Sequence, residues 1–542
     1  MKTILNSIFI TAAAGLFLTS AVSCSDYLEV TPENSQVADD YWRSEADVEN
    51  MLFGGYFYLR SSVESYLIPW GETRAGIVYN HRSNNVLQRW QMVSTNSLCN
   101  WTVFYQIINV ANTVLERAAV AQANDDTYSE ASLKSHYSEA YFLRALAYFY
   151  LVRNFRDVPM PLTAYSDDNV EVNLPQTLEA DVISQIKTDL YAALATGASK
   201  ESYETNWETK GRATRWAIYA LLADVCLWND DYEECIQYCN GILNSNSIKA
   251  PAFLSSPTRN SFMSIFNPGN SNESIFELQW NYEEDQTNNL PTLFYDDVAV
   301  GTYAVSEAAA TEFISEYQAI TGDYGDGDIS SGMNESARTY YANFVPNNSA
   351  GTGFVWKYVG STSKTTRRPA ANYDPNFIIY RVADVILMKA EALLCVDGNE
   401  PTSEHKLEAV TLINKIRERA GWSAENNIAG DFYNDPDMRE DALDEMDIYS
   451  QEELLEAVLN ERKMEFLGEG KIWYDFLRMG RRNNNQYKQT LLCDQVIQYT
   501  RSGSASSSWL RSVLNSDNAL FLPVNASDLE RNPNLVQNPY YN

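Results

Sequence analysis

The spacing of large and small residues between Tyr219 and Ile242 leaves few choices of local structure. Large side chains recur three and four residues apart up to Cys226, and a second run with the same period follows the turn at 229–231. This period is that of one face of an α-helix. Small side chains at Ala223 and Cys235 would allow two helices to approach closely. The segment therefore predicts a helical hairpin.

The spacing is that of a tetratricopeptide helix pair, and looser copies occur elsewhere in the chain. Residues 380–419 predict a second pair that ends at Gly421, and 133–153 with 177–194 predict a third, whose helices are separated by a proline-marked loop. Pairs of this kind stack on one another to bury their apolar faces. The predicted fold class is mainly α, with tetratricopeptide-like hairpins that form a curved scaffold and with little β structure.

The largest interruption of the helical pattern runs from about 250 to 374. It is rich in Asn, Ser, Gly, Pro and Tyr, and its one clear strand candidate is 274–280. Long ordered loops in a compact protein are usually functional. The predicted division is a signal peptide over 1–23, an N-terminal helical region over 24–250, a loop-rich ligand-face insertion over 251–374 and a C-terminal helical region over 375–542.

The first residues predict export and a lipid anchor. Lys2 precedes an apolar run at 8–18, which has the polarity of a signal peptide and is too short to span a bilayer. The run leads to Ala21-Val22-Ser23-Cys24, which resembles the lipobox in which bacterial lipoproteins acylate the cysteine. The alternative is cleavage by ordinary signal peptidase, with Cys24 incidental. No later segment is apolar enough to span a membrane, so lipid on Cys24 would be the only anchor.

Composition argues against several classes of function. The 40 basic and 72 acidic side chains give a net charge of -32, which repels nucleic acid and anionic lipid headgroups. Six cysteines besides Cys24 are sparse for a disulfide framework, and with three histidines they form no tetrahedral zinc set, so we expect them in the core. The 35 Tyr and 12 Trp exceed what packing requires, so some rings are expected to face a ligand.

Residues 460–478 mix charged and aromatic side chains so densely that the charges must be paired. Two short helices broken at Gly468 and Gly470 would bring Arg462 near Glu465 and Asp475 beside Arg478. Such charges are more often buried scaffold pairs than catalysts. We interpret the string as a lock between the C-terminal helices and the repeats.

Several segments, taken in chain order, resemble those of the SusD/RagB family of nutrient-binding lipoproteins from the outer membrane of Bacteroidetes. They are the start at 24–29, the helix at 139–145 followed by Asp157-Val158-Pro159, the segments 211–214 and 380–392, the string 460–478, and the tail segments 522–524 and 532–540. The chain departs from the family at Arg156, where Gly is common, and in the acidic loop 323–328, which lacks the arginine that often follows it.

The resemblance implies a tetratricopeptide-like scaffold, a loop-rich ligand face and a SusC-like TonB-dependent transporter as partner. In that pairing the lipoprotein lies over the extracellular mouth of the barrel, captures a glycan or another nutrient and delivers it inward, with no bond made or broken. It would be located at the outer membrane and face the cell exterior. No cofactor is implied. Three carboxylates could offer oxygen ligands to calcium, but their spacing is not that of an EF-hand and favours a solvated turn: Asp323, Asp326 and Asp328.

An enzyme, a tetratricopeptide-type interaction scaffold and a peptide-binding RagB-like protein are the alternatives. The chain contains no Gly-x-Ser-x-Gly, His-Glu-x-x-His or phosphate-loop motif, and sequence cannot place the carboxylate pair of a glycosidase. A bare scaffold would not need the aromatic insertion. We therefore predict a binding protein that is not an enzyme, with a glycan as the expected ligand and a peptide as the open alternative.

Candidate ligand contacts are rings and polar groups in segments without helical packing. Proteins bind sugars by stacking rings on them and by hydrogen bonds from amide, guanidinium and carboxyl groups. The segment 69–80, the residues that follow it and the polar loop after the predicted strand supply the candidates: Trp70, Arg74, Tyr79, Trp90, Trp280, Tyr282 and Tyr295. A basic patch at Lys364, Arg367 and Arg368 could locally override the negative net charge.

Overall fold

The computed structural model describes residues 41–82, 86–165, 171–297, 299–322, 338, 342–347, 352–361, 366–369, 373–430, 438–500 and 506–542. The predicted signal peptide, Cys24 and the acidic loop with Asp323, Asp326 and Asp328 lie outside the described residues, as does Lys364. The lipid anchor, the calcium site and the division at 250 and 374 therefore stay predictions.

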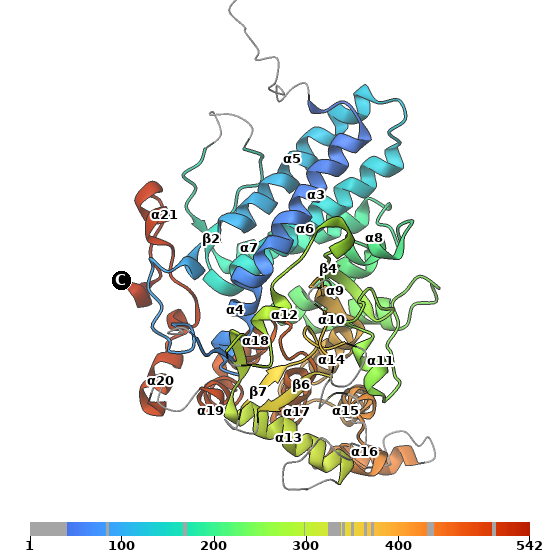
Figure 1. The fold of residues 1–542 in the computed structure, drawn as a ribbon, viewed down its shortest axis with the longest axis vertical. Helices are drawn as coiled ribbons and strands as arrows, with labels where there is room; N and C mark the ends of the chain where they lie inside the picture. The colour runs from blue at the N-terminus through green and yellow to red at the C-terminus, as the bar shows by residue number, and fades with distance from the viewer. Residues whose placement is uncertain are drawn as a thin grey trace, which may run out of the picture.

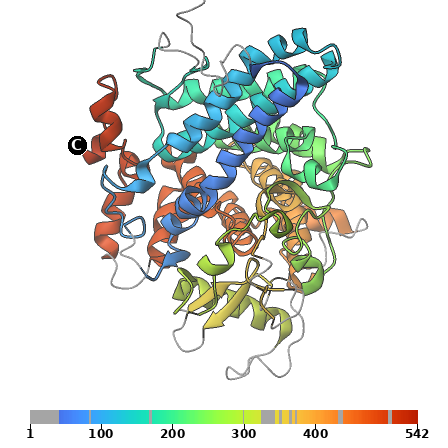
Figure 2. The same cartoon turned by 45° about the horizontal axis from the view of Figure 1, so that its top comes forward.

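Helices pack one after another along most of the chain. The N-terminal layer consists of α3 (Glu45–Ser62), α5 (Thr102–Asn124), α6 (Glu130–Phe155) and α7 (Glu179–Ala195), and the first three run side by side in Figures 1 and 2. The series continues through α9 (Arg215–Trp228), α10 (Tyr232–Leu243), α14 (Val382–Leu393), α15 (Ser403–Ala420) and α17 (Gln451–Glu465), each in contact with its neighbour in the series. The mainly helical fold class is confirmed.

The predicted hairpin is the pair α9 and α10. The two helices are joined at 229–231, and the expected packing positions Ala223, Cys235, Cys239 and Ile242 are buried. The pair α14 and α15 forms the second hairpin, and α6 packs against α7 as expected for the third. Helix α7 begins two residues later than predicted, because Gln176–Thr177 form strand β3 and pair with β2 (Val158–Pro159). Six cysteines of the described residues are buried and unpaired.

The insertion contains more strand than the sequence indicated. The strand expected at 274–280 is β4 (Ser274–Leu278), and it pairs antiparallel with β8 (Phe377–Arg381). A second sheet has the order β1-β5-β7-β6, with β1 (Val78–Asn80), β5 (Tyr303–Val305), β7 (Thr352–Val355) and β6 (Phe344–Asn347). Helix α13 (Glu307–Thr321) packs on this sheet, at the end of the molecule away from α5 (Figures 1 and 2).

Short helices complete the architecture. They are α4 (Ile68–Gly71), α8 (Asn206–Gly211), α11 (Arg259–Met263), α12 (Leu290–Leu293), α16 (Arg439–Met446), α18 (Ile472–Asn485), α19 (Gln495–Tyr499), α20 (Ser507–Leu514) and α21 (Ala526–Arg531). Among the helices of the described residues, none is long and apolar enough to cross a membrane.

The charged string at 460–478 forms the end of α17 and the start of α18, broken where predicted. Gly468 and Gly470 have φ of 80° and 72°, a left-handed conformation that side chains rarely adopt. Arg462 and Arg478 both pair with Asp475, each at 2.8 Å. Glu465 differs from the expectation, because its partners are distant arginines rather than Arg462. All these charges are buried, and Arg478 also pairs with Glu391 of α14, as expected for a lock between the C-terminal helices and the repeats.

Arg381 is the centre of a larger buried ion cluster. Its guanidinium group lies 3.0 Å from Glu273, 2.6 Å from Glu465 and 3.0 Å from Glu469. Arg419 of α15 pairs with Glu273 and Glu465, and Lys357 lies 2.6 Å from Glu469. We call this set the Arg381 cluster. It joins the insertion, the second hairpin and the C-terminal string at one point.

The cluster keeps its carboxylates ionised. Burial alone would raise the pKa of Glu465, but the guanidinium groups of Arg419, Arg381 and Arg338 outweigh it and lower the pKa to about 2. A lone buried carboxylate would instead take up a proton.

We expect Glu465→Gln to lower the free energy of unfolding by about 3 kcal/mol at pH 7, since it removes one of the carboxylate charges that balance the buried guanidinium groups of Arg381 and Arg419. The folded pKa of Glu465 lies below the ordinary 4.5, so its contribution is present above pH 4.5 and is lost as the pH falls toward 2. Urea unfolding of wild type and variant at pH 7, 5 and 2.5 should therefore show a difference that shrinks with acid.

Arg511→Gln is the matched control, because Arg511 and its partner Asp494 lie at the surface. It should leave the unfolding midpoint unchanged. Equal effects of the two substitutions at pH 7 would contradict the structural role of the cluster.

Candidate functional site

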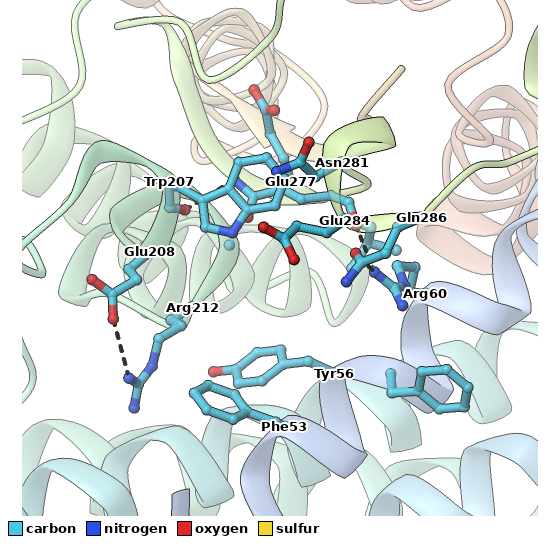
Figure 3. Close-up of a pocket in the computed structure, with 14 residues that line it drawn as sticks. Phe53, Tyr56, Arg60, Trp207, Glu208, Arg212, Glu277, Asn281, Glu284 and Gln286 are labelled. Carbon is cyan, nitrogen blue, oxygen red and sulfur yellow. Dashed lines mark hydrogen bonds and ion pairs between the residues drawn. The ribbon is translucent and has the colours of Figure 1, made fainter. Parts of the chain in front are cut away.

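A cleft of about 470 Å³ opens between the outer face of α3, helix α8 and the segment after β4. We call it the α3 cleft. Figure 3 shows Trp207 on one wall and Phe53 and Tyr56 on the other. The lining residues come from α3, α8 and the segment after β4, which are far apart in the sequence. Strand β4 brings the last of these segments to the two helices.

Three aromatic rings that line the α3 cleft are exposed to solvent and are not part of the core. Phe53, Phe57 and Trp207 are 45%, 55% and 40% exposed. Phe53 and Phe57 are four residues apart and share one face of α3, whereas Leu52 and Leu59 occupy the buried face. Rings held open to water beside a cleft offer flat apolar surfaces to a ligand.

Arg60 contacts both an exposed ring and the polar loop residues of the α3 cleft. It donates hydrogen bonds to the Gln279 carbonyl at 3.0 Å and to Gln286 Oε1 at 2.6 Å, the second of which is drawn in Figure 3. Its guanidinium carbon lies 5.6 Å from the Phe57 ring centroid and 5.7 Å from that of Trp280. Arg60 therefore fixes the loop after β4 against α3.

The charges of the α3 cleft leave its surface neutral to negative. Arg212 is held by Glu139, at 2.7 and 3.1 Å, and by Glu49 at 3.0 Å. Glu284 is exposed, and Glu208 is partly exposed at 3.8 Å from Arg212. Both arginines of the cleft are thus engaged by protein groups, while Glu284 remains open to a ligand.

Two ionisable groups lie beneath the α3 cleft. Burial raises the pKa of the Glu277 carboxyl, although the backbone N–H of Asn270 and the side-chain amide of Asn376 donate to it and oppose the shift. Burial also lowers the pKa of Lys210, to about 8. Of the two, Glu277 lines the cleft, whereas Lys210 donates to the Ser274 carbonyl.

One group among the described residues has the arrangement of metal ligands, namely Cys226, Asp231 and Glu234. The ammonium of Lys187 lies 2.8 Å from Asp231 and 2.6 Å from Glu234. This ammonium already supplies the positive charge that a cation would bring, so the group is a salt bridge at the α9–α10 turn.

Two predicted contacts, Trp280 and Tyr282, lie beside the α3 cleft. Tyr282 is 45% exposed and stands between the lining residues Asn281 and Glu284. Trp280 is only 8% exposed, because it packs against Arg60 at the base of the loop. The predicted polar loop after the strand therefore borders the α3 cleft.

Trp70, Arg74 and Trp90 are buried, so the expectation that they face a ligand from an open loop is wrong. Trp70 stacks on Phe104, with ring centroids 5.2 Å apart. The guanidinium carbon of Arg74 lies 5.0 Å from the ring centroid of Trp90 and 4.6 Å from that of Trp473, and the two rings pack edge to face. The physical reason is that 68–75 folds into short helical turns that pack under the C-terminal string.

Tyr79 and Tyr295 lie away from the α3 cleft. Tyr79, in β1, lines a more polar groove of about 910 Å³ together with Glu307, Thr352 and Thr500. Tyr295 is partly buried beneath Arg367, which lies 4.7 Å from its ring. Of the predicted basic patch, Arg367 pairs with Asp296 at 2.6 Å, and Arg368 is buried with its guanidinium donating to a carbonyl.

The sequence interpretation missed Phe53, Phe57 and Trp207. A usable signal was present in α3, where the two Phe residues and Arg60 share a face that the core positions Val48 and Leu52 do not occupy. Trp207 follows the Thr205 cap of α8, which fixes the start of that helix through Glu208.

The family models, sequence relatives and solved structures described here are of the SusD type. A family model described as the SusD family matches residues 196–541, and a model described as "Starch-binding associating with outer membrane" matches 26–227. A SusD-like protein of Formosa agariphila is 25% identical over 489 residues, which cover 84% of this chain and 88% of the relative. A SusD-like protein of Bacteroides ovatus is 24% identical, with 84% and 79% covered.

Solved structures agree with the fold. A SusD superfamily protein from Bacteroides thetaiotaomicron has a TM-score of 0.69 at 21% identity, with 92% of this chain and 99% of that chain covered. A laminarin-binding SusD-like protein has a TM-score of 0.64 at 20% identity, with 92% and 100% covered. Because the SusD model matches more than half of its residues, this chain belongs to the SusD family.

Proposed function

We propose that this protein binds a neutral glycan at the cell surface, with the α3 cleft as the place where sugar rings stack. The observation that carries the proposal is the set of three exposed rings around one cleft: Phe53, Phe57 and Trp207. The laminarin-binding protein of the same fold supports a glycan as the ligand class.

The chemistry of the α3 cleft suits a sugar. The C–H face of a pyranose is apolar and packs on aromatic rings, while its hydroxyls need donors and acceptors at the edge. The exposed rings would supply the apolar surface. The donors and acceptors would come from Asn281, Gln286 and Glu284. Binding of this kind leaves the ligand intact, which fits a family of binding proteins and a non-enzymatic role.

The charges favour an uncharged ligand. Arg60 and Arg212 already donate to protein groups, so neither is free to neutralise a sulfate or a uronate. Glu284 and Glu208 would repel such groups. A peptide ligand is the alternative, and it would use the same rings with side chains in place of sugars.

The protein would act at the outer membrane. One matching family model carries the description "associating with outer membrane". Cys24 would be acylated and hold the chain at the membrane, with the folded body facing the cell exterior. From there it would deliver the glycan to a SusC-like TonB-dependent transporter.

We expect Phe57→Ala and Trp207→Ala to weaken retention of laminarin on an affinity gel by roughly three- to tenfold each, since each removes one stacking platform. Trp509→Ala is the matched control for Trp207, because Trp509 is 39% exposed on α20 and lies outside the cleft. The control should bind as wild type does, and no variant should change the unfolding midpoint.

Tyr79→Ala serves as the competing test, because Tyr79 lines the polar groove. If laminarin retention fell with Tyr79→Ala and stayed unchanged with both cleft variants, the α3 cleft would be rejected as the glycan site. Release of reducing sugar during the assay would contradict the non-enzymatic role.

Laminarin and chemically sulfated laminarin should differ in affinity by at least tenfold in favour of the neutral polymer, because Arg60 and Arg212, the arginines that line the α3 cleft, already donate to protein groups. Calorimetry with the double variant Glu208→Gln and Glu284→Gln should show a smaller difference. Tighter binding of the sulfated polymer by wild type would refute the selection for neutral glycans.

In cells grown with labelled palmitate, wild type should carry the label and Cys24→Ala should not. The variant should also be absent from the membrane fraction. If it stays there, a transporter that copurifies with the wild-type protein should copurify with the variant as well. Label on Cys24→Ala would show that the anchor lies elsewhere.

A further inference from the structure

A second groove, of about 510 Å³, lies between the start of α5, the loop that follows β2, and helix α21 with the tail after it. We call it the α21 groove. In Figure 1, α21 and β2 lie toward the left of the molecule, whereas α8, which lines the α3 cleft, lies toward the right. The two sites share no lining residue, so the α21 groove is a separate feature of the surface.

Aromatic rings and prolines form the apolar side of the α21 groove. Tyr165 is 39% exposed, and its hydroxyl donates to the Glu171 carbonyl at 3.3 Å. The hydroxyl of Tyr105 donates to the Pro159 carbonyl at 2.7 Å. Because both hydroxyls are bound to the backbone, the rings are held in place and their apolar surfaces remain for a ligand. Val172, which is 60% exposed, extends this surface.

Trp101 adds a hydrogen-bond donor to the apolar side. The residue is 6% exposed, and its ring packs edge-on against Tyr105 and Phe155, with centroids 5.7 and 5.2 Å apart. Its indole N–H donates to no group of the described residues and is not fully buried. The indole N–H of Trp70, by contrast, donates to the Leu98 carbonyl at 3.0 Å. A largely buried indole usually has an acceptor, so the Trp101 N–H is available to an oxygen atom of a ligand.

The α21 groove also offers one carboxylate and one guanidinium group. Neither Asp528 nor Arg531 forms an ion pair or a side-chain hydrogen bond with the described residues. Asp528 is partly buried, and burial raises the pKa of its carboxyl, although Arg531 opposes the shift. Arg531 follows three residues later in α21 and is exposed. A carboxylate accepts and a guanidinium group donates, so the two can bind neighbouring hydroxyl groups of one sugar.

Hydrogen bonds hold the walls of the α21 groove together. The side-chain amide of Asn532 donates to the Leu174 carbonyl at 2.9 Å, and that of Asn534 donates to the Asn173 carbonyl at 2.6 Å. The tail is thereby fixed against the segment that precedes β3. A groove that is already formed loses little entropy when a ligand binds.

We propose that the α21 groove is a second carbohydrate-binding site, in which a sugar ring packs on Tyr165 and its hydroxyl groups bind the Trp101 N–H and the two charged groups. The opposite charges of Asp528 and Arg531 favour a neutral glycan. The inference rests on the proposed function, which supplies the class of ligand. Because a polymer repeats the same sugar units, a protein with two sites would retain it more strongly than through either site alone.

Retention on a laminarin affinity gel tests the inference in a protein whose α3 cleft carries Phe57→Ala and Trp207→Ala. In that background, Tyr165→Ala and Asp528→Asn should each weaken the remaining retention by roughly three- to tenfold, because one removes the ring and the other removes the charged acceptor. Neither change should lower the unfolding midpoint, since Tyr165 is exposed and Asp528 has no ion-pair partner among the described residues.

Tyr540→Ala and Glu530→Gln are the matched controls. Tyr540 is 37% exposed in the tail, Glu530 is exposed on α21, and neither residue lines the groove. Both controls should leave retention unchanged. Equal retention by the two groove variants and their parent would overturn the inference.

Hydrogen exchange of the wild-type protein with and without laminarin separates this inference from the proposed function. Laminarin should slow exchange at 101–105, 159–165 and 526–536 as well as at the α3 cleft. Slower exchange at the cleft alone would overturn the second site and leave the proposed function intact. Slower exchange at the groove alone would support the second site and contradict the cleft, and no change at either would contradict both.

Polyproline is the competing probe, because aromatic grooves with an indole donor also bind proline-rich peptides. We expect it to leave exchange at the α21 groove unchanged. Slower exchange there with polyproline and not with laminarin would assign the groove to a protein ligand and overturn the inference.

Discussion

The fold depends on keeping the charges of the Arg381 cluster paired. Arg381 ends β8 directly before α14, and its three carboxylate partners come from the insertion and the C-terminal string. A buried ion that loses a partner is strongly destabilising, so the cluster tolerates one placement of these segments and penalises others. Sequence-distant parts of the chain are thereby held in one arrangement, which stacking of apolar helices alone would specify less sharply.

The same cluster positions the α3 cleft. Glu273, which pairs with Arg381 and Arg419, directly precedes β4, and β4 pairs with β8. The other end of β4 continues into the loop that Arg60 fixes against α3. The ion cluster therefore fixes one end of the five-residue strand β4, and the other end of β4 leads to the wall of the proposed ligand site. The charged string at 460–478 is thereby connected to the proposed ligand site through β8 and β4.

Sequence predicted the hairpins well, because the periods that encode them are local. The α9–α10 pair could be located from the spacing of Ala223 and Cys235, and the break at Gly468 from its glycines. Exposure could not be predicted in the same way. Trp70 lies in a segment of loop-like composition and is covered by Phe104 of α5 and Phe155 of α6, whereas Phe57 lies in a regular helix and is uncovered. Which face of a helix meets a neighbour is decided by tertiary packing, so the exposed rings of α3 and α8 could not be identified from composition.

Residue type alone does not separate scaffold from function in this chain. Trp70 and Trp207 are chemically identical, as are Arg381 and Arg482, yet the first of each pair has its ring covered or its donors satisfied by the protein. Trp207 keeps an open face, and Arg482 keeps a buried donor without an acceptor among the described residues. A folded chain minimises such groups because each costs stability. The surroundings of a residue, and not its type, therefore decide whether it can meet a ligand, and Trp207 has such an open position beside the α3 cleft.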